Sequence, residues 1–406
     1  MDISVLPILS LIIFSPIVGI ALAAIFRDEG NGVPAKVSAL FSSGISFLLS
    51  LHLWFNFDSS TADLQMVERI PWITQFNIEY FLGLDGLNLF FFLIITFITP
   101  LALLGSWNVA KSNWQFQIQM LLLQIGMLGC FAAMDVVLFY VFFEVMLVPM
   151  YLLIGIWGGP NRLYATIKFF IYTMLGSLLM LISLLYTANI YLDLNGAWSF
   201  SVLDWYGMQI PPETQFWLFL GFAAAFAVKI PLFPLHTWLP DAHYEAPTAG
   251  SVQLAAVMLK FGPYGFLRFA MPIFPAAVFD LTPIFMVLAL IGIIYGGLVA
   301  MVQPQIKRLI AYSSVAHMGY IVLGLFALNI QGLSGSWIQM INHAIVTGAL
   351  FLTVGMIYER THTQEISAYG GVAHTMPKFA VFLVFFSMAS VGLPGLNGFV
   401  GEVLTM

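Results

Sequence analysis

The chain has 406 residues, of which 61% are hydrophobic and only 8% are charged. So few charges cannot cover the surface of a soluble protein of this length, so lipid must serve as the solvent for most of it. The formal net charge of −6 leaves no basic face to neutralise phosphates, which excludes nucleic acid as a partner. The single cysteine, Cys130, excludes an internal disulfide framework and a cysteine-ligated cluster within the chain.

Apolar stretches of about 20 residues, long enough to cross hydrocarbon, recur from one end of the sequence to the other. Because the alternating pattern of barrel strands is missing from the sequence, these stretches predict helices. We therefore expect an all-α membrane protein without a soluble domain, in which the longest connections, 58–81 and 193–212, are surface loops. The roughly twelve expected spans are 7–26, 37–57, 82–106, 114–133, 134–157, 165–191, 213–239, 247–270, 278–303, 309–330, 336–359 and 378–406.

The basic residues predict an orientation, since Lys and Arg gather in cytoplasmic loops. Even-numbered loops contain only Arg69 and Arg268, so the odd-numbered loops are expected in the cytoplasm or matrix and the N-terminus outside. The basic residues of the odd-numbered loops are Arg27, Lys36, Lys111, Arg162, Lys168, Lys307, Arg308, Arg360 and Lys378.

Two spans are interrupted by proline. The seventh reads AVKIPLFPLH over 227–236, and the twelfth reads SVGLPGLNG over 390–398. Pro231 and Pro394 each remove a backbone N–H donor from the helix. We therefore expect the seventh and twelfth spans to be broken helices. Helices five apart run in opposite directions, as an inverted repeat requires, and paired broken helices mark transport sites.

Six ionisable residues lie inside apolar spans, where each charge costs at least about 2.5–3.5 kcal/mol. Their functional interpretation is a proton relay, in which opening a Glu144–Lys229 ion pair would make the lysine release its proton. Histidine suits the middle of such a path. The alternative is that they are structural ion pairs between helices. The six residues are Glu144, Lys229, Lys260, His317, His343 and Glu402.

The segment after the seventh span contains His236, Asp241 and His243, which could connect the broken helix to water. Together with Glu245 these residues could instead form a metal site. Their irregular spacing and the lack of a defining motif favour the first interpretation.

Two stretches are specific enough to suggest a family. Residues 228–252 read VKIPLFPLHTWLPDAHYEAPTAGSV, and 259–268 read LKFGPYGFLR. Both resemble the antiporter-like chain M (mitochondrial chain 4) of NADH:quinone oxidoreductase, respiratory complex I, and APTAGSV at 246–252 is more similar to chain M than to chain L. Supporting segments are LDGL at 84–87, FEVMLVPM at 143–150, KRLIAYSSVAHMGY at 307–320, Asn342-His343 and GLPGLNGFVGE at 392–402.

The resemblance implies fourteen helices with two inverted five-helix repeats, so we expect an N-terminal part at 1–112, a first repeat at 113–272 and an incomplete second repeat at 273–406. The sequence stops within the twelfth span, and we expect it to be a C-terminally truncated fragment. The resemblance also implies that Glu144 modulates Lys229, that Lys260 is central, that His317 relays the proton and that Glu402 releases it.

The same resemblance implies no cofactor in this chain, with NADH, FMN, iron–sulfur clusters and quinone on partner subunits. Chains L and N, lipid and protons are the expected partners, and the bacterial inner membrane is favoured over the mitochondrial one. The alternatives are a subunit of a multisubunit cation/proton antiporter or membrane-bound hydrogenase, a b-type cytochrome with haem between histidines, and a structural scaffold. The cytochrome explains neither Lys229 nor Lys260.

Overall fold

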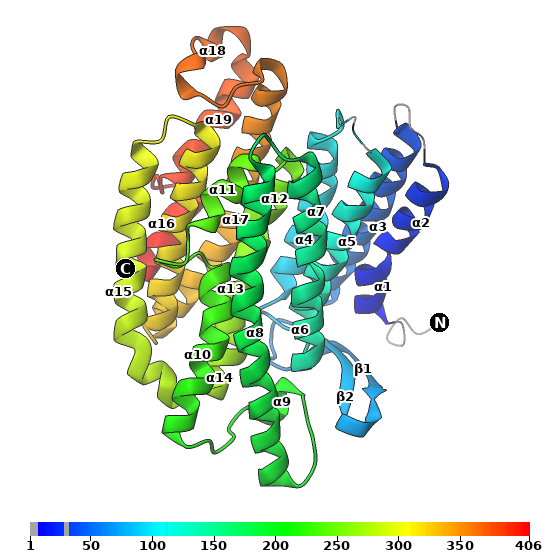
Figure 1. The fold of residues 1–406 in the computed structure, drawn as a ribbon, viewed down its shortest axis with the longest axis vertical. Coiled ribbons are helices and arrows are strands. Elements are labelled where there is room, and N and C mark those ends of the chain that lie inside the picture. The colour runs from blue at the N-terminus through cyan, green and yellow to red at the C-terminus, as the bar shows by residue number, and fades with distance from the viewer. Residues whose placement is uncertain (1–6, 28–31, 110, 112) are drawn as a thin grey trace. The chain divides into compact units, whose positions relative to one another are not determined.

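The computed structural model describes residues 7–27, 32–109, 111 and 113–406. The chain is mostly helical, as expected, and divides into two compact units (Figure 1). Unit 1 comprises Met1–Leu153, Met174–Ala225 and Arg268–Ala277, and unit 2 comprises Ile154–Thr173, Phe226–Leu267 and Val278–Met406. The predicted repeat boundaries at 112 and 272 stay a prediction.

Among the described residues, eight helical segments are long and apolar enough to cross a membrane. Two further apolar helices, Leu89–Gly105 and Pro377–Ser390, are shorter. The expectation of about twelve spans is consistent with this set, although the number itself is not established. The eight segments are Ile8–Ile25, Val33–Asn56, Asn113–Ala132, Val136–Trp157, Arg162–Asn195, Pro275–Met301, Ile306–Phe326 and Ile330–Thr361.

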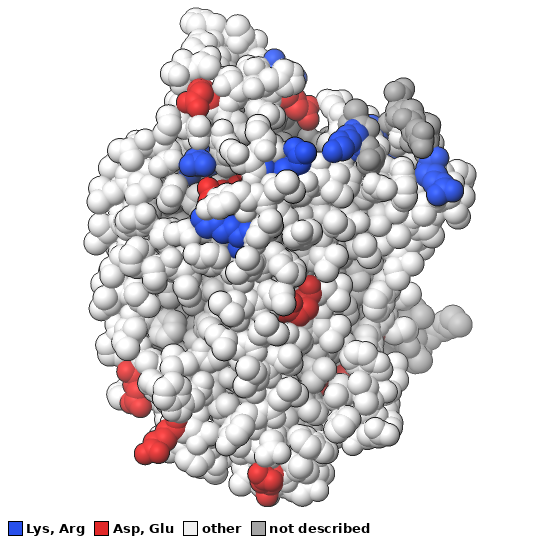
Figure 2. Space-filling view, in the orientation of Figure 1, with Lys and Arg blue, Asp and Glu red and all other residues white. Residues whose placement is uncertain are grey.

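The surface of these helices is rich in large apolar side chains, including Phe41, Leu48 and Phe55 on α3 (Val33–Asn56), which are more than half exposed. Most of the face shown in Figure 2 carries no charged side chain. A membrane protein satisfies its backbone polar groups within helices and presents apolar side chains to lipid, so the exterior is that of a lipid-embedded protein.

In unit 1, α2 packs against α3 and α5, and α4 packs against α3 and α5. Helices α7, α8, α10 and α15 contribute residues to both units. The elements not yet given are α1 (Ile8–Phe14), α2 (Pro16–Ile25), α4 (Leu89–Gly105), α5 (Asn113–Ala132), α6 (Val136–Val145), α7 (Leu147–Trp157), α8 (Arg162–Asn195), α9 (Val202–Trp205), α10 (Pro212–Lys229), α14 (Met271–Ile273) and α15 (Pro275–Met301), with a 3₁₀ turn, η2, at Thr74–Phe76 and a π-helical turn, η4, at Phe266–Ala270.

In unit 2, α17 is the central helix and packs against α12, α16, α19 and α20. The apolar stretch 247–270, expected as one span, is divided into short segments on either side of a 3₁₀ turn. The elements are α11 (Trp238–Glu245), α12 (Thr248–Ala256), η3 (Met258–Lys260), α13 (Phe261–Gly265), α16 (Ile306–Phe326), α17 (Ile330–Thr361), η5 (Ile366–Ala368), α18 (Val372–Thr375), α19 (Pro377–Ser390) and α20 (Asn397–Thr405).

The expectation of a surface loop at 58–81 was wrong. β1 (Gln65–Ile73) and β2 (Ile78–Leu84) form an antiparallel hairpin, with Asn77 in the left-handed conformation that its turn requires (Figure 1). The carboxylate of Glu68 accepts hydrogen bonds from the backbone N–H groups of Leu9 and Ser10, at 2.7 and 3.2 Å. The hairpin therefore satisfies free donors in the first turn of α1, a long-range contact that no local pattern reveals.

Asp135 connects this hairpin to α6. Its carboxylate accepts hydrogen bonds from Val137 N at 2.9 Å and Leu138 N at 3.0 Å, which caps α6. Its second oxygen accepts a hydrogen bond from Glu79 N of β2 at 3.0 Å. Asp135 is 1% exposed, so no water replaces these bonds when the carboxylate is removed.

We expect Asp135→Ala to lower the free energy of unfolding by about 1–3 kcal/mol, because three backbone donors lose their acceptor. Asp135→Asn keeps one acceptor oxygen and should lose less. Denaturant unfolding in detergent micelles measures both, with Asp193→Ala as the control because Asp193 is exposed. Equal stability of Asp135→Ala and this control would contradict the capping role.

Candidate functional site

The first broken helix ends at Lys229, as the sequence predicted. Helix α10 stops there and α11 begins at Trp238, with Pro231 and Pro234 in the connection. The indole of Trp238 donates a hydrogen bond to the carbonyl of Val228 at 3.0 Å, which satisfies an acceptor at the break. Lys229 is 2% exposed, and its ammonium lies 5.7 Å from the ring centroid of Phe169, a cation–π geometry.

Lys260 lies in the 3₁₀ turn η3 between α12 and α13, and it is fully buried. A Cβ added at Gly262 would lie 2.6 Å from the carbonyl oxygen of Phe226 and 2.4 Å from Cγ1 of Ile230. These two residues flank Lys229 in the chain. The absence of a side chain at Gly262 therefore lets the backbone after Lys260 approach the end of α10 and brings the two lysine-bearing turns together.

The Lys260 ammonium contacts the imidazole of His343 on α17. Its Nζ lies 2.6 Å from His343 Nδ1 and also donates a hydrogen bond to the carbonyl of Ala255. A protonated lysine can only donate, whereas a neutral imidazole nitrogen can accept. A single proton therefore lies between Nζ and Nδ1, and one of the two groups donates it to the other.

His317 on α16 lies next to the Lys260–His343 pair. Its ring centroid lies 5.7 Å from that of His343, at an interplanar angle of 61°, and its Nδ1 lies 2.9 Å from Oε1 of Glu402 on α20. Its other nitrogen, Nε2, lies 3.3 Å from the hydroxyl oxygen of Ser390. Lys260, His343, His317 and Glu402 form a continuous series of contacts within unit 2.

A small cavity of about 10 Å³ lies beside this series. That volume accommodates about one water molecule, and its walls include enough polar atoms to hold one. Its lining consists of His317, Gln339, Asn342, His343, Val346, Thr347, Ala389, Ser390 and Gly398. A water here could accept or donate a proton between the two imidazoles.

The second broken helix lies at the end of the series. Helix α19 ends at Ser390 and α20 begins at Asn397, so Pro394 lies in the unwound segment as predicted. Gly392 adopts φ +73°, and a Cβ there would lie 2.6 Å from Oε2 of Glu402. The backbone of the break therefore lies directly against the terminal carboxylate.

The residues considered for access from water lie near one another in unit 2. Asp241 forms ion pairs with Lys168 at 2.8 Å and with Arg308 at 3.5 Å. His236 lies against Tyr295, with ring centroids 5.2 Å apart, and the fully buried His243 stacks on Phe351 at 4.5 Å. Within the described part of the chain, no group of three or more His, Cys, Asp or Glu side chains is arranged to hold a metal ion.

Two larger cavities adjoin these residues. One of about 180 Å³ is lined by Asp241, Glu245 and Arg308, and one of about 350 Å³ is lined by Glu245, Lys307 and Tyr358, each with further residues. Burial raises the pKa of Glu245, although its carboxylate accepts a hydrogen bond from Asn161 N at 3.0 Å, which lowers it. Both cavities are large enough for several water molecules.

Glu144 lies on α6 in unit 1, whereas the other five relay candidates lie in unit 2. It follows Tyr140 by one helical turn and is part-buried. Its pairing with Lys229 stays a prediction.

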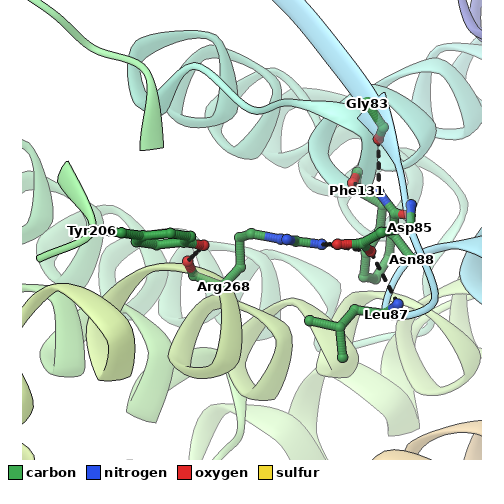
Figure 3. A network of polar contacts seen from close by, with 7 residues as sticks. All are labelled: Gly83, Asp85, Leu87, Asn88, Phe131, Tyr206 and Arg268. Carbon is green, nitrogen blue, oxygen red and sulfur yellow. Dashed lines mark hydrogen bonds and ion pairs between the residues drawn. The ribbon is translucent and has the colours of Figure 1, made fainter. Parts of the chain in front are cut away.

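Sequence reasoning missed a buried ion pair in unit 1 (Figure 3). Arg268 Nη2 donates hydrogen bonds to both carboxylate oxygens of Asp85, at 2.7 and 2.6 Å. Tyr206 donates to the carbonyl of Arg268 at 2.7 Å, and Leu87 N donates to Asp85 at 3.0 Å. Both charged residues belong to segments singled out in the sequence, but 183 positions separate them, so nothing local predicted their contact.

Comparisons with known proteins identify the family to which this chain is similar. Residues 133–406 match the family described as NADH:quinone oxidoreductase/Mrp antiporter, TM. The chain is 47% identical to NADH-quinone oxidoreductase subunit M of Rhodobacter capsulatus, over 98% of this chain and 80% of that protein. It is 43% identical to NADH-ubiquinone oxidoreductase chain 4 of Arabidopsis thaliana, over 98% and 79%. A chain of respiratory complex I from Thermus thermophilus with bound NADH superposes with a TM-score of 0.87 at 35% identity, over 97% of this chain and 81% of that one.

We expect Gly262→Ala to destabilise the protein by about 1–3 kcal/mol, because the added methyl group overlaps backbone and side-chain atoms of the α10 break. Thermal unfolding in detergent, together with proton translocation by the assembled complex, measures the effect. Gly297→Ala on α15 is the matched control, since a Cβ there meets no atom within 4 Å. Equal behaviour of the two variants would contradict the close approach of the two lysine-bearing turns.

Proposed function

The chain belongs to the NADH:quinone oxidoreductase/Mrp antiporter family, as an antiporter-like membrane subunit of respiratory complex I, and we propose that it moves protons through its buried ionisable residues. The proposed order is Glu144, Lys229, Lys260, His343, His317 and Glu402. The observation that supports it most is the unbroken series of contacts from Lys260 to Glu402 within unit 2.

The two polar contacts of the series suit proton transfer, and a water in the cavity beside the two imidazoles would bridge the step between them. Lys260 and His343 share one proton across 2.6 Å, so adding a proton on one side displaces one toward His317. His317 can then release a proton from Nδ1 to the Glu402 carboxylate, 2.9 Å away. Both products of that last step are neutral, which favours it at this depth.

Access from water is proposed at the two cavities around Asp241 and Glu245. Their lining residues combine carboxylates with Lys307 and Arg308, so they can hold water beside titratable groups. His236 and His243 lie on the same segment and would connect these cavities to the buried lysines. Release on the opposite side is proposed through the Pro394 break beside Glu402.

The remaining assignments follow from the family. We propose that NADH, FMN, iron–sulfur clusters and quinone bind to other subunits of the complex and that antiporter-like chains L and N are its neighbours. The bacterial inner membrane is the proposed location. The antiporter alternative is less well supported, because relatives matching 98% of the chain are named as NADH–quinone oxidoreductase subunits.

We expect Lys229→Ala and Glu144→Ala to lower the number of protons translocated per electron while the complex still oxidises NADH. Each proton moved against 100 mV stores about 2.3 kcal/mol, so an interrupted relay appears directly as lost coupling. The measurement uses the assembled complex in sealed vesicles with a pH-sensitive dye.

Lys378→Ala is the matched control, because Lys378 is exposed and lies outside the relay. Wild-type proton-to-electron ratios in both relay variants would refute the assignment.

A further inference from the structure

Two amide side chains of α17 point at the end of the relay. Gln339 is 2% exposed, and its Nε2 donates a hydrogen bond to Oε1 of Glu402 at 3.3 Å. Asn342 is 4% exposed, and its Nδ2 donates to the backbone carbonyl of Asn397 at 2.7 Å. Both therefore contact α20, the helix that follows the second break.

The two amides act as a unit. Residues three apart lie on the same face of a helix, and Asn342 Nδ2 lies 3.5 Å from Gln339 Oε1. The side chain of Asn397 returns a hydrogen bond to Asn342 Oδ1 at 3.3 Å. Together these bonds connect α17 to Asn397, the first residue of α20, and to the carboxylate of Glu402 on the same helix.

The Glu402 carboxylate is held from two sides. Its Oε1 faces both His317 Nδ1, at 2.9 Å, and Gln339 Nε2, at 3.3 Å, while its Oε2 lies against the backbone of Gly392. A carboxylate in solution turns freely, and fixing it costs side-chain entropy that these contacts must offset. In the structure these contacts turn Oε1 toward the imidazole.

We propose that Gln339 and Asn342 form an amide clamp that holds the Glu402 carboxyl against His317 and ties it to the unwound segment of the second broken helix. The clamp makes them positioning residues for the last proton transfer, and this rests on the proposed relay through His317 and Glu402. An amide keeps its hydrogen bonds whether the neighbouring carboxyl is ionised or protonated, because it does not titrate. It can therefore hold the acceptor in place before and after the proton arrives.

Misplacement by about 1 Å can lower a transfer rate a hundredfold, so the clamp has a measurable consequence. Gln339→Met keeps the length of the side chain and removes the donor. Asn342→Leu keeps the volume and removes the bond to the Asn397 carbonyl. Gln331→Met is the matched control, because Gln331 is an exposed glutamine on the same helix.

The experiment measures the proton-to-electron ratio and the infrared carboxylate band of ionised Glu402 in the assembled complex in vesicles. The band is assigned by its loss in Glu402→Gln. We expect Gln339→Met to lower the ratio and to shift the band, because Oε1 of the carboxylate loses a hydrogen-bond donor, and Asn342→Leu to lower the ratio as well. A merely structural role would leave the band where it is.

The outcomes separate the clamp from the relay. A lowered ratio in Glu402→Gln together with a wild-type ratio and an unmoved band in Gln339→Met would overturn the clamp and leave the relay standing. A wild-type ratio in both Glu402→Gln and His317→Gln would overturn the relay and the clamp with it. A shifted band and lowered ratio in Gln339→Met, with wild-type values in Gln331→Met, support the proposal.

Discussion

The structure depends on the cost of placing ionisable groups in hydrocarbon. A lysine or carboxylate at mid-membrane costs several kcal/mol unless another group offsets it, so each such residue must find a neighbour. In unit 2, Lys229 faces an aromatic ring, Lys260 contacts His343, and His317 faces Glu402. The contacts that make burial tolerable are also those along which we propose that a proton passes. Structural and functional needs thus select the same arrangement.

The arrangement of these buried residues also requires segments of unwound backbone. Prolines end α10 at Lys229 and separate α19 from α20, while a 3₁₀ turn replaces regular helix at Lys260. Each interruption frees backbone groups, and nearby side chains satisfy them: the indole of Trp238 at the first break and the amide of Asn342 at the second. The first break is buried at Ile230 and Leu232, whereas Val391 and Leu393 of the second are exposed. The breaks also place lysine and carboxylate side chains beside polar neighbours.

The sequence predicted most of this because its signals are local. The length of the apolar stretches predicted helices, and proline residues predicted both breaks. The relay candidates were identified because they are ionisable residues within apolar stretches. It failed where long-range contacts decide the outcome. The segment 58–81 becomes a hairpin because Glu68 satisfies donors at the start of α1, and Asp85 pairs with Arg268 across 183 positions. Gln339 escaped notice because a lone glutamine in a membrane helix gives no sign of facing Glu402. The 3₁₀ turn at Lys260, which follows the end of α12 at Ala256, was likewise missed.

The central claim is that Lys260 and His343 act as one unit that shares a proton. A double-mutant cycle on the proton-to-electron ratio tests it most directly, using Lys260→Met, His343→Leu and the double variant in the assembled complex. If the two residues hold a single proton between them, either substitution interrupts the path, and the double variant loses no more than the more affected single variant. Losses that add in the double variant would show two independent contributions and contradict the account.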